Sequence, residues 1–277
     1  MKRNILLPTD FSDNAFNALL YALKLYEKEF CTFYFLNVTY VLSSTTRTYI
    51  TTKFVDELQH ESLRKLNELK QQTEIANDNA NHNFEIISSE ENLKFAIPKA
   101  VKAYEITSIV MGTKGASNAV DIFMGSNTVD VLKKVKNCPI LVVPDALEFV
   151  PPRALLFPTD FNRPYKNKEL EAITALANLF HATLKILHIN VEKELSATQE
   201  LHKKRLSDYF ENLPHSFHWE ADYTKKSTTI STFIEENKID LLAMVNYKHS
   251  LLESILKEPV IKKIAFHPTV PVLIIPE

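Results

Sequence analysis

The chain has 277 residues, 45% of them apolar and 24% charged, which is the composition of a globular protein rather than of a disordered or fibrous one. With 32 basic and 34 acidic residues it lacks the basic excess of a nucleic-acid or membrane-surface binder, so we expect neither partner. Two cysteines exclude a disulfide framework or a four-thiolate zinc site, and the absence of an 18-residue apolar run favours a cytoplasmic protein.

Strand and helix patterns alternate through the first half of the chain. Short apolar segments predict strands at 3–8, 32–38, 83–88, 107–112 and 140–143. Longer segments with apolar residues every three or four positions predict helices at 13–29, 50–76, 91–104 and 126–136. This alternation is typical of an α/β domain in which helices cover both faces of a parallel sheet.

The second half repeats the first. ILLPTDF at 5–11 returns as LLFPTDF at 155–161, and CPILVVP at 138–144 returns as VPVLIIP at 270–276. The patterns predict strands at 154–158, 183–190, 216–222, 240–245 and 271–275, and helices at 165–180, 192–212, 228–237 and 253–265. A period near 150 residues predicts two homologous domains, 1–148 and 153–277, separated at Pro151-Pro152.

Glycine is unusually scarce and unusually clustered. A chain of this length would ordinarily carry roughly 19 glycines. This one has 3, namely Gly112, Gly115 and Gly125, although glycine is favoured in turns throughout a chain. We therefore expect these three backbone positions to have a special requirement.

Two segments at the carboxyl ends of predicted strands carry candidate chemistry, because ligands of parallel sheets bind at that edge. One is Pro8-Thr9-Asp10-Phe11-Ser12. The other starts with Gly112-Thr-Lys-Gly115 and reaches Gly125-Ser126 at the start of a predicted helix. Glycines let backbone N–H groups approach an anion, and a helix N-terminus favours negative charge, so together they predict a phosphate cradle. Taken singly, each element also has a structural interpretation as a tight turn or a helix cap.

These residues resemble the universal stress protein family in its tandem, two-domain form. The resemblance rests on the strand followed by PTDFS, on Gly-2x-Gly-9x-Gly-Ser at 112–126 and on the closing CPILVVP, and it covers nearly the whole chain. It implies two tandem Rossmann-like domains, each a five-stranded parallel sheet. It also implies binding of ATP or AMP with slow or absent hydrolysis. Association through the last strands is implied too, here between the two halves of one chain as a pseudo-dimer, or in a homodimer.

The resemblance also implies which residues bind the nucleotide. Pro8, Thr9 and Asp10 would line the adenine and ribose, and Val38 would contact the base. The remaining implied binding residues, at the end of the fourth strand and around the phosphates, are Met111, Gly112, Gly115, Gly125, Ser126, Asn127 and Thr128. Asn127 departs from the small apolar residue usual there, and Lys114 either reaches a phosphate or is solvated. Magnesium would accompany the phosphates, although no carboxylate pair predicts a dedicated metal site.

The second half keeps Pro158-Thr159-Asp160-Phe161 but loses the glycines. It reads Met244-Val-Asn-Tyr-Lys-His-Ser250, with Lys257-Glu258 about where Gly125-Ser126 stood. The added β-carbons and the Glu258 carboxylate would oppose a phosphate. We therefore predict no nucleotide of the family kind in this half, leaving a degenerate loop or a different site around Tyr247.

Three functions remain open from the sequence. The first is a nucleotide-binding stress-response regulator that acts through an unknown protein partner. The second is a slow ATPase or another nucleotide-using enzyme of the same superfamily. The third is an interaction protein whose pocket stays empty. No second carboxylate or evident general base accompanies the cradle in sequence, so no catalytic residue is predicted.

Overall fold

The computed structural model describes residues 2–40, 52–113, 124–190, 194–220, 226–247 and 269–277. These residues form two compact units, with the main division after Ala146. We call the first part unit 1 and the part from Leu147 onward unit 2. None of the described helices is both long and apolar enough to span a bilayer.

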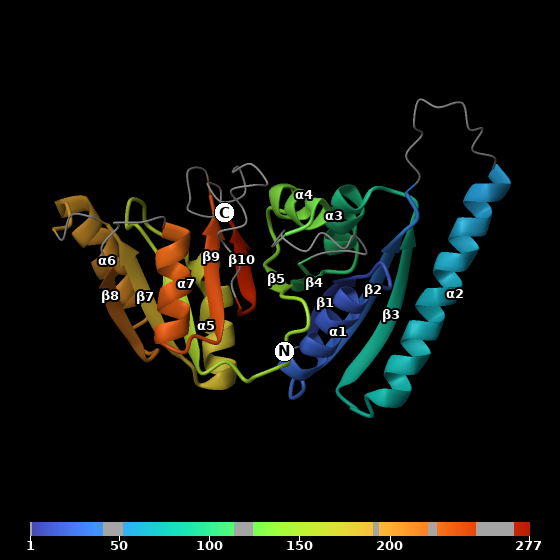
Figure 1. Cartoon of the computed structure of the whole chain (residues 1–277), viewed down its shortest axis with the longest axis horizontal. Helices are drawn as coiled ribbons and strands as arrows, with labels where there is room; N and C mark the ends of the chain where they lie inside the picture. The colour runs from blue at the N-terminus through green and yellow to red at the C-terminus, as the bar shows by residue number, and fades with distance from the viewer. Residues whose placement is uncertain (1, 41–51, 114–123, 191–193, 221–225, 248–268) are drawn as a thin grey trace. The chain divides into compact units, whose positions relative to one another are not determined.

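Unit 1 is built on a parallel sheet with the strand order β3-β2-β1-β4-β5 (Figure 1). Its strands are β1 (Arg3–Pro8), β2 (Cys31–Val38), β3 (His82–Ser89), β4 (Ser108–Gly112) and β5 (Ile140–Val143). Its helices are α1 (Asp13–Leu25), α2 (Thr52–Ala76), α3 (Leu93–Ala103) and α4 (Ser126–Lys134). Right-handed crossovers put α1 and α2 on one face and α3 and α4 on the other. Accordingly α3 packs against α4, while α2 packs on β3 and β2.

Unit 2 has the same topology, with the parallel strand order β10-β9-β6-β7-β8. Its strands are β6 (Ala154–Pro158), β7 (Thr183–Ile189), β8 (His215–Glu220), β9 (Leu241–Asn246) and β10 (Val272–Pro276). The described helices are α5 (Asn167–Phe180), α6 (Ala197–Tyr209) and α7 (Lys226–Glu236). The α/β fold predicted from the repeat is thus confirmed, whereas the helix predicted at 253–265 lies outside the described residues.

Apolar strands explain why the sheets are covered on both faces. Every residue of β4 and β5 is buried, which accounts for their continuous apolar sequences. Two helices in particular are shorter than their patterns predict: α1 ends at Leu25 rather than at residue 29, and α6 ends at Tyr209 rather than at residue 212. The chain leaves α1 at the buried Tyr26, and the Arg3 guanidinium donates to Glu29 at 2.9 Å across the turn into β2.

Candidate functional site

The first wall of the candidate site is the turn after β1. Phe11 has a positive φ of 61°, which is rare for a bulky residue, and its N–H donates to Thr9 Oγ1 at 2.9 Å. The Asp10 carboxylate accepts from both the N–H and the hydroxyl of Ser12, and the Ser12 side chain caps α1. Asn37, at the end of β2, donates to the Thr9 carbonyl at 2.7 Å. The turn is therefore held rigidly at the carboxyl edge of the sheet.

The second wall joins the end of β4 to the start of α4. The Gly125 N–H donates to the Thr113 carbonyl at 2.8 Å. The Thr128 hydroxyl lies 3.3 Å from the Gly112 carbonyl and 3.2 Å from the Thr113 carbonyl and donates to both. These bonds bring the first turn of α4 beside the last residue of β4, although at least twelve residues separate them in sequence.

The N-terminus of α4 has no side-chain cap. Its N-cap residue is Gly125, which has no side chain to accept a bond, whereas Ser12, Asn92 and Ser196 cap α1, α3 and α6. The first backbone N–H groups of an α-helix need external acceptors, and they carry the positive end of the helix dipole. The start of α4 is therefore chemically suited to an anionic group such as a phosphate.

The two walls enclose a pocket of about 100 Å³. Among the residues predicted to bind a nucleotide, those lining it are Pro8, Thr9, Asp10, Val38, Met111, Gly112, Asn127 and Thr128. Ala15, Asn37 and Leu93 line it as well and were not predicted. Asn37 had a signal, since it directly precedes Val38 at a strand end, but Leu93 belongs to a helix that no binding motif marked.

The other predicted residues lie elsewhere. Gly125 and Ser126 stand at the start of α4, Gly125 as N-cap and Ser126 as first helical residue, rather than in the pocket lining. Lys114 and Gly115 lie outside the described residues. The pocket enclosed by the described side chains is small beside ordinary ligand pockets of roughly 300–1,000 Å³.

Gly112 is a glycine for a reason that the sequence did not reveal. No described glycine has a positive φ, so conformational freedom explains neither Gly112 nor Gly125. A β-carbon on Gly112 would lie 1.8 Å from Asn14 Oδ1 and 3.1 Å from the Asn14 carbonyl oxygen. Gly112 thus makes room for the first turn of α1, a packing requirement that the sequence analysis did not predict.

Unit 2 contains the same turn with the same geometry. Phe161 has a φ of 55° and its N–H donates to Thr159 Oγ1, while Asp160 accepts from the Asn162 N–H at 3.0 Å. The helix that follows starts later than in unit 1: α1 begins at Asp13, two residues after Phe11, but α5 begins at Asn167. Pro164 disfavours helical backbone at the residue before it, so the first helical turn is lost.

Side chains from that segment and from the residue after β9 contact the turn in unit 2. The Tyr165 hydroxyl donates to Thr159 Oγ1 at 2.8 Å, and the Tyr247 hydroxyl donates to the Asp160 carboxylate at 3.3 Å. The Arg163 guanidinium lies over both rings, 4.1 Å from the centre of the Tyr247 ring. We call Arg163, Tyr165 and Tyr247 the aromatic plug. Its two tyrosine hydroxyls hydrogen-bond to the threonine and aspartate of this turn, whose counterparts in unit 1 line the pocket.

The surroundings of the aromatic plug keep its two tyrosine hydroxyls protonated. Burial, together with Asp160, raises the pKa of Tyr247 to about 12, and burial raises the pKa of Tyr165 well above its ordinary value. Both hydroxyls stay protonated at neutral pH and remain donors. Arg163 makes a two-bond ion pair with Glu169, whose side chain is 2% exposed. The guanidinium is thereby anchored between the two rings.

We expect Arg163→Met to lower the free energy of unfolding of unit 2 by about 3 kcal/mol, because it leaves the Glu169 carboxylate buried without its cation. Urea unfolding followed by circular dichroism measures the loss. Arg64→Met is the control, since Arg64 pairs with Glu61 and Glu68 on the exposed surface of α2 and its loss should change stability little. Equal effects of the two substitutions would contradict a structural role for the plug.

The chain is similar to known proteins in sequence and in fold. The universal stress protein family model matches residues 1–144. A universal stress protein from Archaeoglobus fulgidus has a TM-score of 0.68 at 20% identity, over 99% of this chain and 96% of that one. A protein of unknown function from Pseudomonas aeruginosa has a TM-score of 0.63 at 12% identity, over 99% of this chain and 92% of that one. These two likenesses are evidence of fold alone.

No curated protein matches the sequence. Among the described residues, no three His, Cys, Asp or Glu side chains gather as a metal site. The family model, however, covers more than half of the chain, including β1, β4 and the start of α4, on which the candidate site is built. The chain belongs to the universal stress protein family.

Proposed function

We propose that this protein is a cytoplasmic stress-response regulator that binds an adenine nucleotide, ATP or AMP, in unit 1 and acts through contacts with a protein partner. The observation that carries the proposal is the meeting of three chain segments in one pocket. Three segments far apart in sequence, those of Thr9-Asp10, Met111-Gly112 and Asn127-Thr128, line one pocket at the carboxyl edge of the sheet. Each segment belongs to the set of nucleotide-binding residues that the family resemblance implies.

The chemistry of the pocket agrees with a nucleotide. Val38 and Met111 provide apolar contact for a base, and Asp10 provides a carboxylate of the kind that accepts hydrogen bonds from ribose hydroxyls. The uncapped N–H groups of α4 offer donors for phosphates, with magnesium as the counter-ion. In the proposed complex, one end of the pocket is therefore apolar and the other anion-binding.

We expect hydrolysis of the nucleotide to be slow or absent. Asp10 is the one titratable side chain among the described residues that line the pocket, and general acid–base catalysis usually needs a second positioned group. A regulator that reads nucleotide binding is therefore favoured over an enzyme of the same superfamily.

Calorimetric titration of nucleotide-free protein with ATP and magnesium tests the proposal. We expect about one site per chain, because the aromatic plug occupies the corresponding residues of unit 2. Two equivalent sites would contradict the interpretation of unit 2. If no ATP and no AMP bound, the nucleotide function would be wrong.

A further inference from the structure

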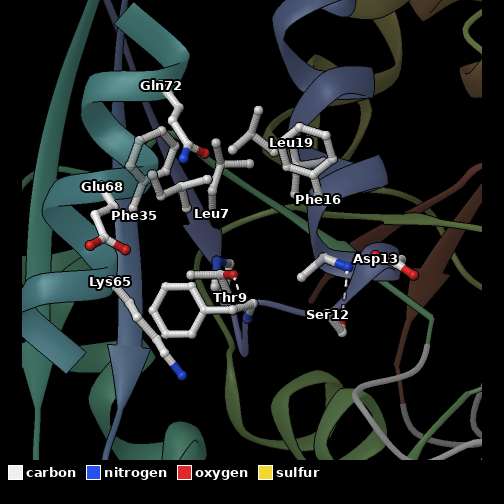
Figure 2. Close-up of a pocket in the computed structure, with 15 residues that line it drawn as sticks. Leu7, Thr9, Ser12, Asp13, Phe16, Leu19, Phe35, Lys65, Glu68 and Gln72 are labelled. Atoms are coloured by element: carbon white, nitrogen blue, oxygen red, sulfur yellow. Dashed lines mark hydrogen bonds between the residues drawn. The ribbon is translucent and has the colours of Figure 1, made fainter. Parts of the chain in front are cut away.

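A second cavity of unit 1 lies on the opposite side of the β1 turn from the candidate nucleotide pocket. It is a groove of about 430 Å³ between α1 and α2, floored by β1 and β2 (Figure 2). Pro8, Thr9 and Ala15 line both cavities, so the two cavities adjoin at these residues. Of the two, only the groove is lined by residues of α2. We call it the α1–α2 groove.

The groove exists because two helices on the same face diverge. α2 packs mainly on β3 and β2, whereas α1 packs mainly on β4. Of the 25 residues of α2 only Ser62, Leu66 and Thr73 are buried, so this long helix covers the sheet loosely. The space over β1 and β2, between the two helices, is therefore only partly filled.

The floor and sides of the groove are apolar. Leu7 and Phe35 form the floor, and they are 3% and 0% exposed. Leu19 and Phe16 face in from α1, and Leu69 is half-buried on α2. Figure 2 shows Leu19 and Phe16 opposite the side chains of α2, with Leu7 between them. A cavity of this size and lining lies in the range of pockets that hold small organic molecules.

The charged α2 side chains that line the groove have ion-pair partners within α2. The Lys65 ammonium lies 3.4 Å from Glu61, and Arg64 pairs with the Glu68 carboxylate. The Asp13 carboxylate, at the start of α1, also lines the groove, so an anionic occupant is disfavoured. Gln72 directs an uncharged amide over the floor (Figure 2), which offers both a donor and an acceptor, and one hydrogen-bonding group on an uncharged occupant is enough to meet it.

We propose that the α1–α2 groove is a second ligand site, which takes an uncharged, mainly apolar small molecule carrying one carbonyl, amide or aromatic amine group. Its apolar body lies on Leu7 and Phe35 between the two helices, and its polar group meets the Gln72 amide. This site is independent of the proposed nucleotide function, because its specific contacts come from α2.

Fluorescence titration of the nucleotide-free full chain with N-phenyl-1-naphthylamine tests the site. This probe is neutral and carries one N–H. We expect saturable binding of about one probe per chain. Leu69→Glu, which places a carboxylate in the groove, should weaken binding at least tenfold. Leu63→Glu is the matched control on the same helix, since Leu63 is already 38% exposed and does not line the groove, and it should change affinity less than twofold.

A second pair guards against misfolding of Leu69→Glu. Gln72→Met and Gln71→Met remove the side-chain amide with little change in size at adjacent exposed positions, and only Gln72 lines the groove. We expect Gln72→Met to weaken probe binding at least threefold and Gln71→Met to leave it unchanged. Equal effects within either pair of folded variants would overturn the proposal, as would absence of saturable binding.

Two further results would also overturn it. If ATP displaced the probe and Leu69→Glu left the affinity for the probe unchanged, the probe would occupy the pocket at the strand ends. If wild-type protein dimerised and Leu69→Glu made it monomeric in sedimentation, the groove would bind a second copy of the chain instead. Tenfold tighter binding of the anionic analogue 8-anilinonaphthalene-1-sulfonate would refute the uncharged class of ligand.

Discussion

Asp10→Ala is expected to weaken ATP binding about thirtyfold. The Asp10 carboxylate lines the pocket of unit 1, and a hydrogen bond to a charged group contributes about 2 kcal/mol. Calorimetry at a fixed magnesium concentration measures the change. Asp10→Asn should lose less, because the amide oxygen can still accept one bond and can still receive the Ser12 N–H that shapes the turn.

Asp160→Ala is the matched control for this experiment. Asp160 occupies the same position in the repeated turn of unit 2 and accepts the corresponding backbone bond from Asn162. Its removal therefore reproduces the local damage to the turn without touching the proposed nucleotide pocket. We expect ATP affinity to be unchanged. A loss as large as that of Asp10→Ala would mean that the turn, rather than the carboxylate, is what the measurement detects.

Gly112→Ala is expected to destabilise unit 1 by about 3 kcal/mol. The new methyl group displaces the Asn14 side chain, which is 6% exposed, and breaks its 3.3 Å hydrogen bond to Thr113 Oγ1. Overpacking of a core costs about 1–3 kcal/mol, and a lost buried hydrogen bond about 1 kcal/mol more. Urea unfolding measures the loss, and an unchanged midpoint would show that Asn14 moves aside freely.

The double variant Gly112→Ala/Asn14→Ala should recover much of that stability. Once the Asn14 side-chain amide is removed, the nearest atom to the new β-carbon is the backbone carbonyl oxygen of residue 14, at 3.1 Å. Unit 2 supports this expectation: β1 pairs Ile5 with Ser108 and β6 pairs Leu155 with Leu241, so Val245 is the counterpart of Gly112. There Pro164 replaces Asn14. A double variant less stable than either single one would contradict the contact.

Short-range patterns were sufficient to predict most of the fold. The strands at 140–143 and 154–158 begin and end where the apolar segments do, because a strand buried on both faces must be continuously apolar. The same reasoning predicted that the segments containing Asp10 and Gly112 lie together at the carboxyl edge, since parallel strands end on one side. Local periodicity and the repeat were enough for this, whereas Met111 and Thr128 were implied by the family resemblance.

Other features depend on contacts between residues far apart in sequence. The requirement for glycine at 112 comes from Asn14, which the packing of α1 on β4 brings against it. The aromatic plug needs Tyr247, beyond β9, to meet Arg163, beyond β6. The α1–α2 groove depends on how closely α2 packs on the sheet. The sequence by itself therefore determined the order of strands and helices and the edge that carries the site. The tertiary structure alone decided which side chains fill or leave the spaces between them, because packing depends on distances that periodicity does not encode.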